Sequence, residues 1–379
     1  MATGKALDGK PYAGNPHVRF DEGEVAPAAT PRRGSLLYKK PLRTLFYGTM
    51  HEHAPGKLET LKKLSDDFEV VAIVDDRPRK SPTYHADPFL ADGMKVVSEE
   101  EAWDVKDIDV AFVEVANRDL MEIAARFAER GIPMHCDKPC GEAMEPFRSV
   151  VETCRRKNVP LQIGYMFRVN PAVQFSWKAV REGWLGDLSF IEADMNHCYG
   201  DDSYQRYVGT FKGGILYNLG CHLVDMIEPM TSGMPGRVHS VIGTAAGDTP
   251  ECLNRTAALL EYPSMDVLIR SCSRAGSGLA GRRLRIDGSN GTIDLCPIER
   301  FDGERLVLNM TLLKPAGGYC AGANAVDLGV QTDRYAEQLR ELARIVRGEI
   351  PNDPARYDHD LKVHELTLMA CGYGREMAT

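Results

Sequence analysis

The segment from Gly213 to Asp225 carries the side chains that most directly suggest proton transfer. If this segment is helical, Asn218 and His222 lie on one face, one turn apart. Asp225 follows His222 by one further turn and can orient the imidazole. A histidine held by a carboxylate titrates near neutral pH and can exchange a proton with a substrate. The alternative is a structural His–Asp pair that only stabilises the helix.

A second group of polar side chains follows a short apolar strand that we predict at residues 133–136. Asp137, Lys138 and Pro139 come directly after this strand. In open α/β sheets, ligands bind at the carboxyl ends of the strands, and proline fixes the backbone just after Lys138. We therefore expect a ligand at this end of the strand. The alternative is a surface lysine beside an acidic partner.

The first predicted strand, residues 43–47, leads into a turn that can meet a dinucleotide. Such turns have the pattern G-x-G-x-x-G, because glycine permits the tight turn and the close approach of backbone to pyrophosphate. Gly48 fits the pattern, whereas Met50 and His53 occupy the second and third glycine places. The helix that follows still directs its N-terminus at the carboxyl end of the strand, where phosphate is attracted.

The second predicted strand, residues 69–74, ends in Asp75, Asp76 and Arg77. A carboxylate at this place accepts hydrogen bonds from both ribose hydroxyls and repels a 2′-phosphate, and Arg77 can stack on adenine. These residues predict NAD, with NADP less favoured. The alternative is a solvated loop without a ligand.

Aromatic and polar side chains gather between residues 197 and 207. This mixture suits a sugar, because aromatic rings stack on its apolar face while its hydroxyls need polar partners. The alternative is an ordinary polar loop. The side chains are His197, Tyr199, Asp201, Tyr204, Arg206 and Tyr207, and Tyr165 and Lys212 could add contacts.

Two successive patterns of secondary structure must position these groups. Up to residue 164, short apolar strands alternate with amphipathic helices, which predicts a parallel sheet with right-handed crossovers. Its strands are expected at 43–47, 69–74, 95–97, 110–115, 133–136 and 161–164, and its helices at 53–64, 119–130 and 145–157. Beyond residue 164, longer alternating segments predict a mostly antiparallel sheet. Its strands are expected at 188–195, 238–243, 257–262, 265–270, 283–287, 292–295 and 305–311, with helices at 171–182, 219–230, 333–347 and 358–373.

Composition restricts the remaining possibilities. The 379 residues carry a formal net charge of −8, which disfavours a nucleic-acid binder, and no run of apolar residues is long enough to span a membrane. Ten cysteines are too few for a dense disulfide framework, so we predict reduced thiols and a cytoplasmic protein. Cys136 and Cys140 have no second ligand pair of zinc type, so no metal is expected. Residues 1–41 have no sustained period or secretory signal and are expected to form an arm or tail.

Three of these segments, in this order, resemble the Gfo/Idh/MocA family of oxidoreductases. The family's E-K-P motif corresponds to Asp137-Lys138-Pro139, and its G-Y/N-x-x-R-x-x-P stretch to residues 164–171. Its G-G-x-x-x-D-x-x-x-H-x-x-D helix corresponds to residues 213–225, with Asn218 at the place of the first acid. The helix D-R-Y-A-E-Q-L-R-E-L at residues 333–342 is also similar to the family's. The resemblance covers residues 42–375.

The resemblance implies a fold of the α/β plus α+β class. An N-terminal Rossmann domain with a doubly wound parallel sheet is expected at residues 42–165. A C-terminal domain with an open mixed β-sheet is expected at residues 166–379, and its last helices can pack back on the first domain. The family buries its open sheet face against another subunit, which implies a homodimer or homotetramer.

The resemblance also implies roles for individual residues. The nicotinamide would lie between the domains, with Lys138 beside it and the substrate hydroxyl, His222 as the acid–base group and Asn218 bonded to the hydroxyl. The expected cofactor contacts are Gly48, Met50, His51, Asp75, Asp76, Arg77, Asn117, Asp137, Lys138 and Pro139. The expected substrate contacts are Tyr165, Arg168, His197, Tyr199, Tyr207, Asn218 and His222.

Our main hypothesis is therefore an NAD(H)-dependent oxidoreductase acting on a secondary hydroxyl of a sugar, glycoside or cyclitol. Two alternatives remain. One is a hydrolase that cleaves glycosides through transient oxidation by a retained NAD. The other is a non-enzymatic protein that senses a nucleotide.

Overall fold

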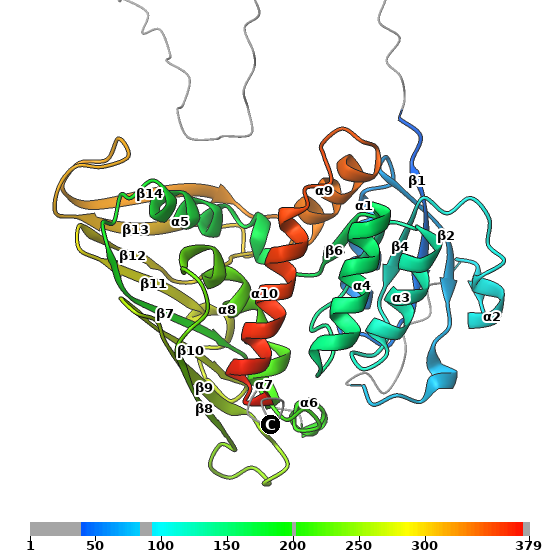
Figure 1. Ribbon diagram of the computed structural model, residues 1–379, viewed down its shortest axis with the longest axis horizontal. Coiled ribbons are helices and arrows are strands. Elements are labelled where there is room, and N and C mark those ends of the chain that lie inside the picture. The colour runs from blue at the N-terminus through cyan, green and yellow to red at the C-terminus, as the bar shows by residue number, and fades with distance from the viewer. Residues whose placement is uncertain (1–38, 84–92, 199–201, 374–379) are drawn as a thin grey trace, which may run out of the picture. The chain divides into compact units, whose positions relative to one another are not determined.

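The computed structural model describes residues 39–83, 93–198 and 202–373. The expected arm at residues 1–41 lies outside this range apart from its last three residues. From Lys40 onward the chain forms one compact unit that contains two sheets (Figure 1).

The first sheet is parallel and has the order β3-β2-β1-β4-β5-β6. Its strands are β1 Leu42–Tyr47, β2 Phe68–Val74, β3 Val96–Val97, β4 Val110–Val113, β5 Met134–Cys136 and β6 Leu161–Ile163. Because the order runs outward in both directions from β1, the carboxyl ends of β1 and β4 border a crevice at which doubly wound sheets bind ligands. The predicted Rossmann sheet is confirmed.

Helices cover both faces of this sheet, as the alternation of its side chains requires. On one face, Leu45 and Tyr47 pack with α3 and α4. On the other face, Phe46 and Phe112 pack with α1 and with α9. These helices are α1 Ala54–Lys63, α3 Leu120–Arg130, α4 Met144–Lys157 and α9 Ala336–Val346, and α2 Glu99–Ala102 and the 3-10 turn η1 Arg77–Arg79 complete this half. A helix from the end of the chain therefore packs on the N-terminal sheet.

The second sheet has the order β14-β13-β12-β11-β7-β10-β9-β8. Its strands are β7 Leu188–Asn196, β8 Arg237–Gly243, β9 Arg255–Glu261, β10 Asp266–Cys272, β11 Arg283–Gly288, β12 Gly291–Leu295, β13 Arg305–Leu312 and β14 Gly322–Val330. The pair β7–β10 is parallel and the other pairs are antiparallel, so the predicted open mixed sheet is confirmed. The edge strand β14 was not predicted, because Val326 is its one buried residue and leaves no alternation to detect.

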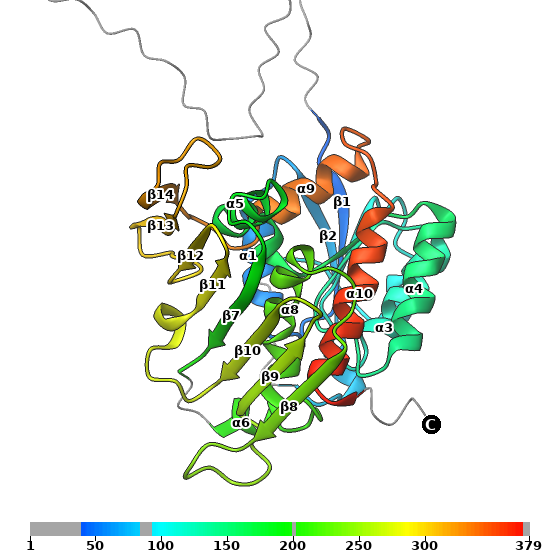
Figure 2. The same cartoon turned by 60° about the vertical axis from the view of Figure 1, so that its left-hand side comes forward.

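Helices and 3-10 turns cover one face of the second sheet (Figure 2). They are η2 Met166–Val169, α5 Pro171–Arg181, α6 Asp202–Val208, α7 Gly214–Asn218, α8 Cys221–Ile227, η3 Glu228–Met230 and α10 Ala355–Ala370, and η4 Gly278–Gly281 follows β10. Sequence predicted one helix at 219–230, but the structure divides this range into α8 and η3, and a break separates α8 from α7, which lies before the predicted range. Gly220 lies at the break, where a Cβ would come within 2.5 Å of the Leu216 carbonyl oxygen. None of the described helices is long and apolar enough to cross a membrane.

A buried group of charges, which we call the α10 cluster, joins η2, α8 and α10. The Arg168 guanidinium lies 2.6 Å from Asp225 and 2.6 Å from Asp360. His359 lies 3.1 Å from Asp225 and 2.5 Å from Glu228. The cluster ties the last helix to the segment that follows β6, at the boundary between the two sheets (Figure 1).

The cluster predicts a specific dependence of stability on pH. Burial and Arg168 act to lower the pKa of His359, but its bonds to Asp225 and Glu228 outweigh them and raise the pKa from 6.5 to about 9. A raised pKa means that the charged imidazole stabilises the fold below pH 6.5, and that this contribution is lost as the pH rises through 9. In the wild type, loss of this charge should lower the unfolding free energy by on the order of 2 kcal/mol between pH 6.5 and 9. We expect His359→Gln to lack this part of the decrease.

Urea unfolding of the wild type and His359→Gln at pH 6.5, 7.5 and 9 measures this contribution. The two proteins should differ most at pH 6.5 and converge at the alkaline end. A constant difference across the series would show that His359 does not change its charge in this range.

Candidate functional site

Lys138 lies at the carboxyl end of β5, at the boundary of the two sheets. Its ammonium is 1% exposed, donates a hydrogen bond of 2.8 Å to the backbone carbonyl of Asn218, and lies 3.5 Å from Glu52 Oε1. The carbonyl of Lys138 accepts bonds of 3.1 Å from Asn117 Nδ2 and His51 Nε2. The structure thus brings together four residues that sequence analysis assigned to the site. Pro139, also assigned, is buried next to them and follows a cis peptide bond.

A buried ion cluster lies below the Lys138 backbone. Lys57 Nζ is 2.5 Å from Asp137 Oδ2 and 2.9 Å from Glu114 Oε1, and the three side chains are fully buried. Burial alone lowers the pKa of Lys57, but the two carboxylates raise it overall. Burial raises the pKa of Asp137, but His51, Lys57 and His53 together hold it well below its usual range. The pKa of Glu114 stays well above its usual range, chiefly because of burial.

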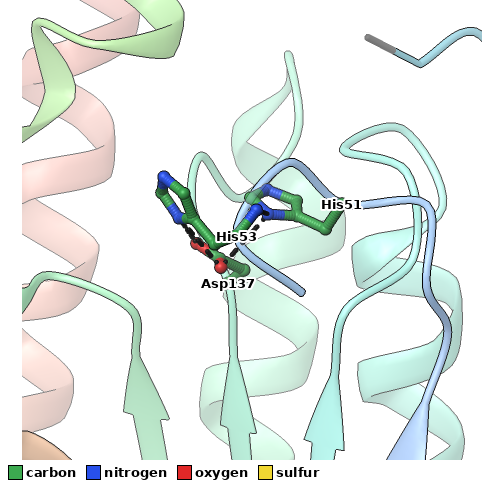
Figure 3. A group of neighbouring side chains, drawn as sticks. All are labelled: His51, His53 and Asp137. Atoms are coloured by element: carbon green, nitrogen blue, oxygen red, sulfur yellow. Dashed lines mark hydrogen bonds and ion pairs between the residues drawn. The ribbon is translucent and has the colours of Figure 1, made fainter. Parts of the chain in front are cut away.

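Two histidines of the loop between β1 and α1 contact the same aspartate (Figure 3). His51 Nδ1 lies 3.2 Å and His53 Nδ1 3.1 Å from Asp137 Oδ2. One ligand atom from each of the three residues lies within 4.8 Å of the other two, a spacing that a metal ion could use. The Lys57 ammonium already occupies the cation position beside this carboxylate. We therefore infer that the group supports the loop and Lys138.

The turn after β1 fits the phosphates of a dinucleotide. Gly48 has a φ of +97°, and a Cβ there would lie 2.7 Å from the Val115 nitrogen, so the turn admits only glycine. The N-terminus of α1 has no side-chain cap and no acidic residue in its first turn, which leaves the positive end of the helix dipole open to an anion. Met50 and His53, at the other glycine places, are partly exposed at the mouth of the turn.

The acidic residues after β2 divide into two roles. Asp75 is partly exposed and forms two bonds of 2.7 Å with the Arg77 guanidinium. Asp76 is buried and accepts a bond of 2.8 Å from the Thr49 amide, so it fixes the turn after β1. Burial raises the pKa of Asp76 to about 6 despite these bonds. Of the predicted pair, Asp75 is the carboxylate that stays accessible at the end of β2.

His222 is fully buried, and neither of its ring nitrogens has a hydrogen-bond partner among the described residues. The rings of Tyr165 and Phe167 pack edge-on against it, with centroids 5.9 and 5.3 Å away. Burial, and next the charge of Lys138, hold the pKa of His222 well below its usual value, so the imidazole is neutral. Two buried nitrogens without partners are what a site for a hydrogen-bonding ligand presents.

The expectation that Asp225 orients His222 is wrong. Asp225 points into the α10 cluster, where Arg168 and His359 bind it. His222 and Asp225 both lie on α8, and the break at Gly220 lies instead between Asn218 and His222. The same cluster holds Arg168, a predicted substrate contact, although its guanidinium also lies 5.0 Å from the centre of the Tyr165 ring.

The remaining predicted substrate residues surround Asn218 and Asn117. The Tyr204 hydroxyl donates a bond of 3.0 Å to Asn218 Oδ1, and the Tyr207 hydroxyl bonds Asn117. His197 is partly buried 3.2 Å from the Arg282 guanidinium. The Asn218 Nδ2 atom is buried without a partner among the described residues.

Two further predicted wall residues lie at the surface. Arg206 and Lys212 are exposed, and Tyr199 and Asp201 lie outside the described residues. Three residues of this region were not predicted from the sequence as site residues: Glu52, Lys57 and Arg282. A signal for Lys57 exists, because it shares the buried face of α1 with Ala54, Leu58 and Leu61, where an unpaired cation would be costly.

Comparison with known proteins agrees with this geometry. Residues 43–165 match the profile of an oxidoreductase family with an NAD-binding Rossmann fold, and residues 174–294 match the GFO/IDH/MocA C-terminal domain. The chain is 26% identical over 271 residues to D-apiose dehydrogenase of Paraburkholderia graminis, covering 68% of this chain and 67% of that protein. It is 27% identical to the rhizopine catabolism protein MocA of Rhizobium meliloti, covering 68% and 85%.

Solved structures share the fold. Aldose-aldose oxidoreductase from Caulobacter crescentus superposes with a TM-score of 0.67 at 20% identity, over 88% of this chain and 98% of that one. These proteins share the arrangement of the two sheets. The chain belongs to the Gfo/Idh/MocA family of NAD-binding oxidoreductases.

Proposed function

We propose that this protein is an NAD-dependent dehydrogenase that oxidises a secondary hydroxyl of a sugar, glycoside or cyclitol, or reduces the corresponding ketone. The observation that carries the proposal is the pairing of a buried ammonium, Lys138, with a buried neutral imidazole, His222. Lys138 bonds the carbonyl of Asn218, one turn before His222, and its charge acts on the imidazole. Oxidation of an alcohol requires a proton acceptor and a group that stabilises the developing alkoxide, and His222 and Lys138 can supply these two functions.

The protein's own groups account for the proton. In the oxidation direction, the neutral His222 accepts the hydroxyl proton, since both its nitrogens lack partners among the described residues. Lys138 donates a hydrogen bond to the same oxygen and stabilises the alkoxide as it develops. The bound nicotinamide supplies the hydride acceptor. Asn218 directs the hydroxyl through its unbonded Nδ2.

The surrounding side chains support a polyhydroxylated substrate. Tyr204, Tyr207 and His197 offer rings next to the amides of Asn218 and Asn117. Aromatic faces suit the apolar side of a sugar ring, and amides can donate to and accept from hydroxyls. Two relatives carry names that refer to apiose and to rhizopine catabolism, which agrees with this substrate class.

Turnover depends on Lys138 and His222 while folding does not. We expect Lys138→Ala and His222→Ala each to lower kcat by about 10²–10⁴-fold, because a positioned proton-transfer group contributes that much. NAD affinity should stay within about threefold of wild type. The assay follows NADH at 340 nm with a panel of aldoses, glycosides and cyclitols, and circular dichroism confirms folding.

Exposed Glu100 on α2 provides a matched control, and Glu100→Ala should leave kcat unchanged. Wild-type kcat in both site variants would refute the catalytic assignment. Cleavage of a glycoside without net formation of NADH would instead favour the hydrolase alternative.

Cofactor choice depends on Asp75. Because its carboxylate lies at the end of β2 and binds the Arg77 guanidinium, a 2′-phosphate would meet a like charge, and Arg77 is not available to it. We expect kcat/KM to favour NAD over NADP by more than about tenfold, or 1.4 kcal/mol. Asp75→Ala should narrow this preference, since it removes the repulsion and releases Arg77. A wild-type preference for NADP would show that Asp75 does not read the ribose.

We also propose a homodimer or homotetramer built on the outer face of the second sheet. Val241 of β8 is 51% exposed and Val307 of β13 is 39% exposed, on the side away from the helices that cover the inner face. Light scattering at micromolar concentration should give a multiple of 42.0 kDa. Val241→Glu together with Val307→Glu should shift the mass towards the monomer, and a wild type of 42.0 kDa would contradict the proposal.

A further inference from the structure

Asn218 of α7, which precedes the helix that carries His222, supplies no negative charge to Lys138. Asn218 stands where the family resemblance places an acid, and its Oδ1 accepts a bond from the Tyr204 hydroxyl. Its contact with Lys138 is through the backbone carbonyl. A neutral side chain here leaves open which anion balances the buried ammonium.

Glu52 of the loop between β1 and α1 lies on the other side of the ammonium. Its Oε1 atom is 3.5 Å from Lys138 Nζ, and its side chain is 12% exposed. Burial acts to raise the pKa of Glu52, but Lys138, His53 and His51 outweigh it and lower the pKa overall, so the group is a carboxylate. The loop therefore brings an anion to the ammonium from outside the helix.

No other described carboxylate meets Lys138 Nζ within 4.0 Å. Asp137, its chain neighbour, binds Lys57 and both loop histidines, and it accepts a bond from the Lys138 amide rather than from the ammonium. Glu114 also binds Lys57. Among the described residues, the negative charge next to the ammonium is that of Glu52.

We propose that Glu52 is the positioning residue for Lys138. From its place in the dinucleotide turn, Glu52 supplies the negative charge that Asn218 does not. The inference rests on the proposed dehydrogenase function. An ammonium has three N–H donors. One is bonded to the Asn218 carbonyl and a second faces Glu52, which leaves the third for the substrate oxygen.

This role also gives a reason for the altered glycine turn. Glu52 sits directly before His53, the residue at the third glycine place, and His51 and His53 anchor the loop to Asp137. His51 also donates to the Lys138 carbonyl, so the loop holds the lysine at both its backbone and its ammonium. The contacts of His51 and His53 thus place Glu52 against Lys138.

The first test compares Glu52→Gln with Glu52→Asp. The amide keeps the size of the side chain and removes the charge, so kcat should fall by about 10²-fold, as expected when a reacting group is misplaced by about 1 Å. The aspartate variant keeps the charge and should retain kcat within about tenfold. NAD affinity and substrate KM should change by less than about threefold in both, and Glu100→Gln is the control. Equal kcat in wild type and Glu52→Gln would overturn the proposal, as would equal losses in the Gln and Asp variants.

The second test needs no turnover. A double-mutant cycle isolates the interaction of the two side chains. It compares the melting temperatures of the wild type, Glu52→Gln, Lys138→Met and the double variant. A departure from additivity of more than about 2 °C supports the pairing, and additive changes overturn it. If the wild type oxidises no carbohydrate while the cycle shows coupling, the proposed function fails and the Glu52–Lys138 pair stands.

Discussion

The buried ion pairs of Lys57 with Asp137 and Glu114 are the interaction on which the site depends. Burying charged and polar groups is costly, and the cost is offset only when their geometry is held by the elements that carry them. Those elements are α1 and the carboxyl ends of β4 and β5, which border the crevice of the parallel sheet. The cluster thus fixes the first helix to the two strands beneath Lys138, and it orients the peptide from which that side chain extends.

The same cluster explains how a dinucleotide turn can function with one of its three glycines. In the usual turn, glycines allow the backbone itself to approach the ligand. Here Gly48 provides the turn, while His51 and His53 hold the loop by side-chain contacts to Asp137. Loop and strand end are linked at several points, so the position of Lys138 relative to the turn does not depend on the loop backbone alone.

Much of the fold could be predicted because its strands are buried on both faces and appear as continuous apolar runs, as in β2 and β4. The contact between the ends of β5 and α7 followed from the family resemblance, since strand ends and helices far apart in sequence carry no pairing signal of their own. Helical periodicity predicted that Asp225 would orient His222, and both residues do lie on α8, but Arg168 and His359 bind the Asp225 carboxylate instead. The partners of Lys57 and Glu52 are set by tertiary packing, and a sequence shows only that a charge stands on an apolar face.

We propose that Lys138 and His222 lie where the nicotinamide meets the substrate hydroxyl. A crystal structure with NAD and a bound carbohydrate tests it most directly. We expect the nicotinamide between the two sheets, one substrate hydroxyl within hydrogen-bond distance of Lys138 Nζ and a His222 nitrogen, and its C–H carbon about 3–3.5 Å from the ring. A nucleotide bound away from the carboxyl ends of β1 and β4, or a nicotinamide turned away from both side chains, would contradict the account.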